Sequence, residues 1–265
     1  MKLLLINYSN LICLQSDHRI LQSMRHFGLT GKKLQHSFSK SYFEKKWKSE
    51  QISDCSYQLF ELDSIEDILE LLYSNSGLIG LNVTIPYKTQ IIHYLDELSS
   101  MANEIQSVNC IKKVDGKWIG HNTDALAFLI SLKNLLPNGF SSRVLVLGTG
   151  GASKSVQWVL NQMNLRFDLA SSSGKGIPYP ELHFNWNPDW KLIINTSPIG
   201  MSPEQDAKPN IPYQYIDDSY YLYDLIYNPE KTLFLKLGAE LGSSIKNGLE
   251  MLHLQADESW RFWNE

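Results

Sequence analysis

A glycine turn between an apolar strand and a helix is the feature of this sequence that most constrains its fold. Arg143–Leu147 has the composition of a buried strand, and Ala152–Met163 has that of a helix. Residues 148–151 between them have the sequence Gly-Thr-Gly-Gly. A strand, a glycine turn and a helix in this order typically form one unit of a parallel, doubly wound α/β sheet.

The same turn also has the residues of an anion site. Gly148 allows a tight turn, and Gly150 lets the backbone approach a pyrophosphate. Gly151 and Ala152 complete the turn, and Ser153 stands where a third small residue lets helix and strand pack closely. The positive end of the helix dipole favours phosphate there. We therefore predict a dinucleotide site; the alternative is a βα turn that needs glycine only for a positive φ.

The residues after the next predicted strand, Phe167–Ala170, indicate which dinucleotide binds. A site for NAD usually has an acidic residue about 20 positions after the turn, where it holds the ribose hydroxyls. Residues 171–175 read Ser-Ser-Ser-Gly-Lys instead. The hydroxyls of Ser171 and Ser172 and the charge of Lys175 suit a 2′-phosphate, so NADP is the predicted cofactor. In the alternative interpretation, Lys175 is a solvated loop lysine.

An α/β pattern also runs through the first half of the chain. Tyr57–Leu62 and Leu78–Val83 have strand composition, and a helix capped by Ser64 lies between them, which predicts parallel pairing. Asp115-Gly116 separates two further apolar runs and predicts a hairpin. We expect a mostly parallel sheet with an antiparallel addition here, and a domain boundary between residues 122 and 137.

Composition and charge exclude several classes of partner. The net charge is −4, which makes the chain a poor general binder of nucleic acid or of anionic membranes. No apolar run reaches the ~20 residues of a membrane span. Cys13, Cys55 and Cys110 form no C-x-x-C pair and no zinc-type spacing with histidine. We therefore expect a cytoplasmic protein without a metal site.

Polar residues gather at the ends of the predicted strands of the first half, in the segments HSFS, NVTIPYK, SVN and GHNTD. Thr84 ends the strand Leu78–Val83, and Pro86 is compatible only with the first turn of a helix after it. Lys88 is therefore predicted in that first turn, at the sheet edge where open α/β sheets bind ligands. Because a helix dipole disfavours a cation there, the lysine is expected to have another role.

Asp124 is the candidate partner of Lys88, since it also ends a strand and starts a helix. A lysine and an aspartate can together hold a hydroxyl or ketone and pass a proton while a hydride moves. The polar residues also have structural interpretations, as helix caps or turn residues. These interpretations concern Thr123 and Asp124, Ser37 and Ser39 before a helix starting near Lys40, and Asn82 and Asn109.

In their order along the chain, these segments resemble the shikimate dehydrogenase family, from about Phe27 to Trp263. The matching segments are HSFSKSYF, NVTIPYK, SVNCI, GHNTDALAF, VLVLGTGGASK, INTSPIGM, YDLIYNPEKTLFL and KNGLEMLHLQA. The resemblance implies the NADP-dependent reduction of 3-dehydroshikimate to shikimate. It also implies two α/β domains, one mostly parallel and one Rossmann-like, with the substrate in the cleft between them.

The resemblance further implies the role of each site residue. Lys88 and Asp124 would form the catalytic pair. The substrate would contact Ser37, Ser39, Thr84, Lys88, Asn109, Asp124, Tyr227 and Gln255. The cofactor would contact Gly148, Gly150, Gly151, Ala152, Ser153, Ser171, Ser172, Lys175, Asn195, Thr196, Met201 and Gly248. Residues 1–122 would bind the substrate, residues 123–247 would bind NADP, and a helix over 248–265 would pack back onto the first domain.

The chain departs from the family in two places. Residues 171–173 are three serines where the family usually has Asn-Arg-Thr, which bears on the NADP preference. Residues 1–23 precede the usual start of the family, so we expect Met24 to be the native start. Peptides from residues 1–20 in the endogenous protein would exclude this.

Three other functions remain open from the sequence. The substrate could be quinate, which differs at the carbon bearing the carboxylate, near Ser37, Ser39 and Tyr227. A methylene-tetrahydrofolate dehydrogenase shares the architecture, but the segments NVTIPYK and NTD argue against it. A non-catalytic module would bind shikimate without needing Lys88 and Asp124. We expect a monomer or a homodimer.

Overall fold

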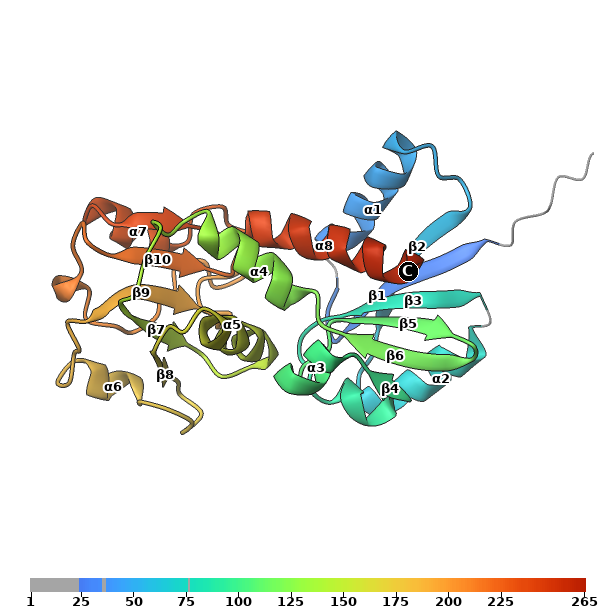
Figure 1. The fold of residues 1–265 in the computed structure, drawn as a ribbon, viewed down its shortest axis with the longest axis horizontal. Coiled ribbons are helices and arrows are strands. Elements are labelled where there is room, and N and C mark those ends of the chain that lie inside the picture. Colours follow the sequence, from blue (N-terminus) through green and yellow to red (C-terminus); the bar gives the residue numbers. More distant parts are fainter. Residues whose placement is uncertain (1–23, 35–36, 76) are drawn as a thin grey trace, which may run out of the picture.

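The computed structural model describes residues 24–34, 37–75 and 77–265. It contains two β-sheets, each with helices on both faces, which lie end to end along the long axis of the molecule (Figure 1). We call the part built on the six-stranded sheet the first lobe and the part built on the five-stranded sheet the second lobe. This is the two-part α/β architecture predicted from the sequence.

The sheet of the first lobe has the strand order β2-β1-β3-β5-β6-β4. Its strands are β1 (Arg25–Gly31), β2 (Cys55–Glu61), β3 (Leu78–Val83), β4 (Glu97–Leu98), β5 (Cys110–Val114) and β6 (Lys117–His121). The pairs β1–β2, β1–β3 and β4–β6 are parallel, whereas β5 is antiparallel to β3 and β6. Asp115 and Gly116 form the predicted hairpin turn, with φ values of 49° and 82°.

Two groups of helices cover the two faces of this sheet. One face packs against α2 (Ile68–Ser74), α3 (Ser100–Ile105) and the 3₁₀ helices η1 (Ile65–Asp67) and η2 (Ile91–Tyr94). The other packs against α1 (Phe38–Ser49) and α8 (Leu249–Asn264). The side chains alternate between the faces along each strand. Cys110 therefore packs on the face covered by α1 and α8, and Ile111 on the face covered by α2 and α3.

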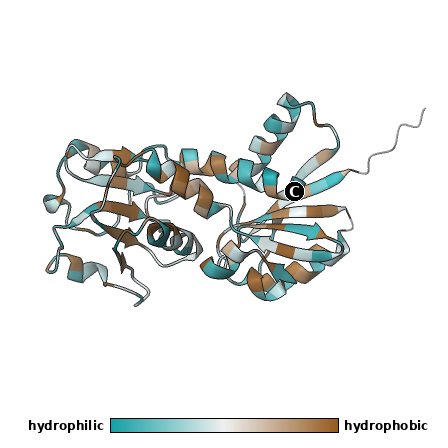
Figure 2. Cartoon of the chain, in the orientation of Figure 1, coloured by the Kyte–Doolittle hydropathy of each residue, from teal (hydrophilic) through white to brown (hydrophobic). Residues whose placement is uncertain are grey.

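The sheet of the second lobe is entirely parallel, with the order β11-β10-β9-β7-β8. Its strands are β7 (Arg143–Leu147), β8 (Phe167–Ala170), β9 (Trp190–Asn195), β10 (Tyr221–Asp224) and β11 (Ser244–Lys246). The helices α4 (Asp124–Lys133) and α5 (Gly151–Gln162) cover one face, and α6 (Tyr179–Leu182) and α7 (Leu233–Glu240) cover the other. The central strands β7 and β9 of this sheet are mostly hydrophobic, as parallel strands buried on two faces must be (Figure 2).

The last helix connects the two lobes. Near its start, Met251 lies in the core of the second lobe, and near its end Phe262 and Trp263 lie in the core of the first. Along its length it packs against α4 (Figure 1). Within the described residues, no helix is both long enough and apolar enough to cross a membrane.

Candidate active site

The polar segments of the first lobe meet at one edge of its sheet. β3 and β6 run in the same direction, because β5 is antiparallel to both. The segments after β3 and β6, and the segment before β5, therefore reach the same edge. Thr84, Asn109 and Asp124 lie on these three segments.

Lys88 and Asp124 form an ion pair at this edge. The distance between Lys88 Nζ and Asp124 Oδ2 is 2.6 Å, and the side chains are 16% and 7% exposed. The other carboxylate oxygen of Asp124 accepts a hydrogen bond from Asn109 Nδ2 at 2.9 Å. The carboxylate is thus held on both sides, while part of the lysine side chain remains accessible to a ligand.

The local structure around Lys88 differs from the prediction. The chain forms consecutive turns after Thr84, and the helix that follows is the short 3₁₀ helix η2, which begins at Ile91. Lys88 therefore precedes the helix, and the predicted conflict between its charge and a helix dipole does not arise. The backbone of Lys88 is held by Val108, whose N–H donates to Lys88 O at 2.7 Å.

A buried chain of hydrogen bonds supports the ion pair from below. Asn109 Nδ2 also donates to Thr123 Oγ1 at 2.9 Å, and Asn109 Oδ1 accepts from Thr123 N at 2.7 Å. Asn82 Nδ2 donates to Ser259 Oγ at 2.9 Å, and Tyr57 Oη donates to Asn82 Oδ1 at 2.8 Å. Ser259 Oγ on α8 lies 3.3 Å from Thr123 Oγ1, so the network joins five segments of the chain.

The structural interpretations of these residues are wrong in several respects. Thr123 and Ser37 occupy N-cap positions, but neither side chain makes a capping hydrogen bond. The first helix begins at Phe38 and not near Lys40. Asn82 lies inside β3, where its side chain belongs to the buried network, and is not a turn residue.

Ser37 precedes Phe38, whose ring lies near the segment that follows β10. Ser37 Oγ is buried and has no hydrogen-bond partner among the described residues. The ring of the neighbouring Phe38 is 6.1 Å from that of Tyr227, whose pKa is raised by burial. Ser39, in the first turn of α1, is also buried. A hydroxyl without a partner in a buried place is the kind of group that a ligand oxygen satisfies.

Gln255 lies on α8, one turn before Ser259. Its Nε2 donates to Leu252 O at 3.0 Å, and its backbone oxygen accepts from Ser259 Oγ at 2.8 Å. Gly248 precedes the helix, where a Cβ would lie 2.0 Å from Leu225 O, so no side chain fits there. The positions of Gln255 and Gly248 are thus set by the packing of α8.

The glycine turn at the end of β7 fits the phosphates of a dinucleotide. Gly148 has a φ of 106°, which favours glycine, and Ser153 Oγ closes the turn by donating to Gly148 O at 2.8 Å. No atom lies within 4 Å of a Cβ built on Gly150, so the backbone there is open to a ligand. The first N–H groups of α5 have no partner within the helix and are available to phosphate oxygens.

The turn also lies where this sheet order places a ligand. β7 and β9 are neighbours, and the chain leaves them toward opposite sides of the sheet, which makes their carboxyl ends a topological switch point. Thr196 follows β9, and its Oγ1 lies 2.8 Å from the position of a Cβ on Gly148. The same hydroxyl donates to Leu147 O at 2.8 Å and so ties the two loops together.

Asn195 has a structural role in this loop. Its side chain is fully buried, with Nδ2 donating to Asp224 Oδ1 at 3.0 Å and Oδ1 accepting from Ser197 N at 3.1 Å. Asp224 also accepts from Thr232 Oγ1 at 2.6 Å, and burial raises its pKa to about 6. Met201, in the same loop, is 41% exposed.

The serine segment after β8 is folded onto the glycine turn. Ser171 is buried and donates its hydroxyl to Lys175 O at 2.7 Å, whereas Ser172 is exposed. Ser173 Oγ lies 3.0 Å from Thr149 Oγ1 in the glycine turn. Burial and the nearby charge of Lys175 lower the pKa of Lys154. Lys154 Nζ itself donates to Gln106 O at 2.9 Å, and the hydroxyl of Ser171 is engaged by Lys175 O.

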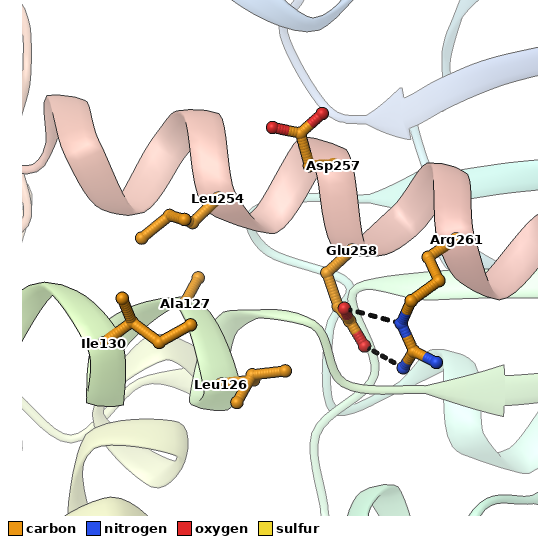
Figure 3. Close-up of a pocket in the computed structure, with 7 residues that line it drawn as sticks. All are labelled: Leu126, Ala127, Ile130, Leu254, Asp257, Glu258 and Arg261. Atoms are coloured by element: carbon orange, nitrogen blue, oxygen red, sulfur yellow. Dashed lines mark hydrogen bonds and ion pairs between the residues drawn. The ribbon is translucent and has the colours of Figure 1, made fainter.

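A pocket of about 200 Å³ lies between α4 and α8 (Figure 3). It is lined by Leu126, Ala127, Ile130, Leu254, Asp257, Glu258 and Arg261. Arg261 pairs with Glu258 at its rim. None of the predicted site residues lines this pocket, so the candidate site is the polar edge described above.

The sequence did not identify a supporting role in the site for four residues: Asn82, Asn122, Thr123 and Ser259. Asn82 is the single polar residue in the apolar strand Leu78–Val83, and Ser259 follows Gln255 at helical spacing on the side of α8 that also carries Phe262. A polar residue inside an apolar stripe was the available signal. The pairing of these residues required the tertiary structure.

Comparison with known proteins gives consistent matches over most of the chain. The model of the shikimate dehydrogenase substrate binding domain matches residues 29–111. The shikimate dehydrogenase (NADP(+)) of Methanococcus aeolicus is 33% identical over 253 residues, which cover 89% of this chain and 90% of that protein. The protein of the same name from Pelagibacter ubique is 35% identical, with 90% and 93% of the two chains covered.

A solved structure has the same fold. Shikimate 5-dehydrogenase from Thermus thermophilus, in complex with NADP(H) and shikimate, superposes with a TM-score of 0.80. The two chains are 26% identical, and the superposition covers 91% of this chain and 93% of that one.

Proposed function

This chain belongs to the shikimate dehydrogenase family, and we propose that Lys88 and Asp124 transfer the proton in its reaction. The activity is the reversible, NADP-dependent reduction of 3-dehydroshikimate to shikimate. The observation that carries the proposal is the 2.6 Å ion pair at the sheet edge that the glycine turn of the second lobe approaches.

In this proposal the ion pair acts on the oxygen of the reacting carbon. NADPH supplies the hydride when it is bound. Lys88 Nζ donates a proton to the ketone oxygen as it becomes a hydroxyl, and it accepts that proton in the reverse direction. Asp124 Oδ2 aligns the ammonium group, and Asn109 Nδ2 holds the carboxylate in place from its other oxygen.

Other residues would bind the rest of the substrate. The partner-free hydroxyl of Ser37 supports a role for Ser37 and Ser39 in holding the carboxylate, with Thr84 and Tyr227 beside them. Asn109, Asp124 and Gln255 would hold the ring hydroxyls. Shikimate and 3-dehydroshikimate are thus the proposed partners, and we propose a monomer or homodimer as the functional state, which sedimentation velocity would determine.

The proposal is tested by turnover of the purified protein. We expect NADPH to form from shikimate and NADP⁺, with NAD⁺ and quinate run in parallel as poorer alternatives. In Lys88→Ala, kcat should fall by about 10²- to 10⁴-fold, because general acid–base catalysis contributes that much. Lys45→Ala, which removes an exposed lysine of α1, is the matched control and should retain full activity.

Two outcomes would contradict the proposal. If folded wild-type protein shows no turnover with any combination of these reactants, it is a binding module and not an enzyme. If Lys88→Ala is as active as Lys45→Ala, the proton is transferred by another group.

A further inference from the structure

The first turn of α5 touches the first lobe beside the catalytic lysine. A Cβ built on Gly151 would lie 3.0 Å from Lys88 Cβ and 3.1 Å from Ser107 Oγ. Ser107 is fully buried, and its hydroxyl has no hydrogen-bond partner among the described residues. The turn that faces the cofactor phosphates thus lies directly against the segments that carry the proton-transferring pair.

Backbone conformation does not explain the glycine at this position. Gly148 needs glycine because its φ is 106°, and Gly150 has open space above it. Gly151 is the first residue of α5 and is not among the residues with a positive φ. A Cβ at residue 151 is therefore crowded only by the first lobe, whose atoms would have to move by a few tenths of an ångström to admit it.

Hydrogen bonds hold α5 at this contact. Asn122 Nδ2 donates to Ser107 O at 2.8 Å and to Ser155 Oγ on α5 at 3.0 Å. Farther along the helix, Lys154 Nζ donates to Gln106 O at 2.9 Å, and Trp158 Nε1 donates to Glu104 Oε2 at 2.8 Å. We call these bonds and the Gly151 contact the α5 seam. Because the seam is bonded at several points, α5 cannot shift freely to make room for a side chain.

We propose that Gly151 is a positioning residue for the reaction, whose missing side chain sets the distance between the cofactor turn and Lys88. This inference rests on the proposed function. Gly151 acts through Lys88 and the seam and need not touch the substrate. A methyl group there pushes the two segments apart by a few tenths of an ångström and separates the hydride donor from the proton donor.

The inference predicts a separation of binding from turnover. Gly151→Ala should bind NADP⁺ within about 2-fold of wild type, because the N–H groups of the α5 N-terminus remain. Its kcat at saturating reactants should fall by about 10-fold, since a misplacement of about 1 Å can cost about 10²-fold and the displacement here is smaller. Gly150→Ala is the reciprocal control, in which a methyl group enters the open space above the turn and should weaken NADP⁺ binding by about 10-fold.

Variants at Ser107 test the same contact from the first lobe. Ser107→Ala removes the Oγ and should keep kcat within about 2-fold of wild type. If the two sites are coupled, the double variant should have a kcat about 3-fold higher than that of Gly151→Ala alone. Ser107→Thr adds a methyl group to the contact without changing the glycine turn. Ser107→Thr should lower kcat at unchanged NADP⁺ affinity. If Gly151→Ala does not fold, Ser107→Thr provides the test of the contact.

The experiment measures NADP⁺ affinity by calorimetry without substrate, and kcat with shikimate, for wild type and each variant. An inactive wild type would contradict the proposed function, whereas the inference itself is tested among active proteins. It is overturned if Gly151→Ala loses NADP⁺ affinity at unchanged kcat, because the glycine then serves the phosphates. It is also overturned if neither quantity changes, or if Ser107→Ala gives no rescue.

Discussion

At the scale of single residues, the proposed role of Ser37 rests on a buried hydroxyl. Its hydroxyl is buried and has no partner among the described residues, although most buried polar groups in proteins do. Such a group lowers the stability of the free protein, and we expect it to be paired when the substrate carboxylate binds.

Ser37→Ala should therefore separate stability from substrate binding. The free energy of unfolding should stay the same or rise by up to about 1 kcal/mol, because a desolvated hydroxyl is removed. KM for shikimate should rise by about 10- to 100-fold, the value of a hydrogen bond to a charged group. Thermal denaturation and initial rates measure the two effects, with Ser41→Ala on the exposed side of α1 as control. Parallel losses of stability and affinity would show that the hydroxyl has an internal partner.

Asp224 is a buried carboxylate that is hydrogen bonded only to neutral groups among the described residues. Burial raises its pKa from 3.8 to about 6. The folded state therefore binds this proton more tightly than the unfolded state, and the carboxyl group lowers stability above pH 6. As the pH falls through 6 toward 4, this cost is relieved.

Wild type should accordingly gain stability relative to Asp224→Asn on acidification. Between about pH 7 and about pH 5 the difference in unfolding free energy should shift by about 1 kcal/mol in favour of wild type. Urea denaturation of both proteins at the two pH values gives this difference, in which other titrating groups largely cancel. A constant difference would mean that Asp224 does not titrate in this range.

At the scale of elements, the sequence predicted strands well where they are apolar and sharply bounded. β3, β7 and β8 have the predicted limits, because glycine or polar residues follow each apolar run. The strands β4 and β11 have two and three residues and were not predicted, since so short a run has no periodicity. Lys88 was placed correctly at the sheet edge, but for the wrong reason, because the turns after Pro86 do not form a helix at once.

The last helix provides a test of how elements stabilise one another. The ring of Trp263 packs against that of Phe27 with their centroids 4.7 Å apart, and its Nε1–H donates to Ile111 O at 3.0 Å. Trp263→Ala should lower the free energy of unfolding by about 3–5 kcal/mol, as large truncations in cores do. Arg261→Ala, two residues earlier, breaks exposed ion pairs and should cost less than about 1 kcal/mol. Chemical denaturation compares the two, and equal effects would place Trp263 outside the core.

At the scale of the whole molecule, the sequence indicated two α/β units but not how they meet. Glycine turns and apolar runs are local signals, and they identified each sheet and the edge at which the candidate site lies. The α5 seam depends on Asn122, Ser107 and Ser155, which lie up to 48 residues apart in sequence and have no distinctive pattern. Contacts of this kind follow from the packing of finished elements, so they could not be predicted from spacing.

The seating of α8 has a consequence for how the protein is made. Phe262 and Trp263 complete the core of the first lobe, although most of that lobe is encoded at the start of the chain. On the ribosome, the first lobe therefore waits with an exposed apolar face while the entire second lobe is synthesised. Phe262 and Trp263 then fill this core once they have left the exit tunnel. A chain that stops before Phe262 lacks both side chains, so we expect its first lobe to keep that apolar face exposed.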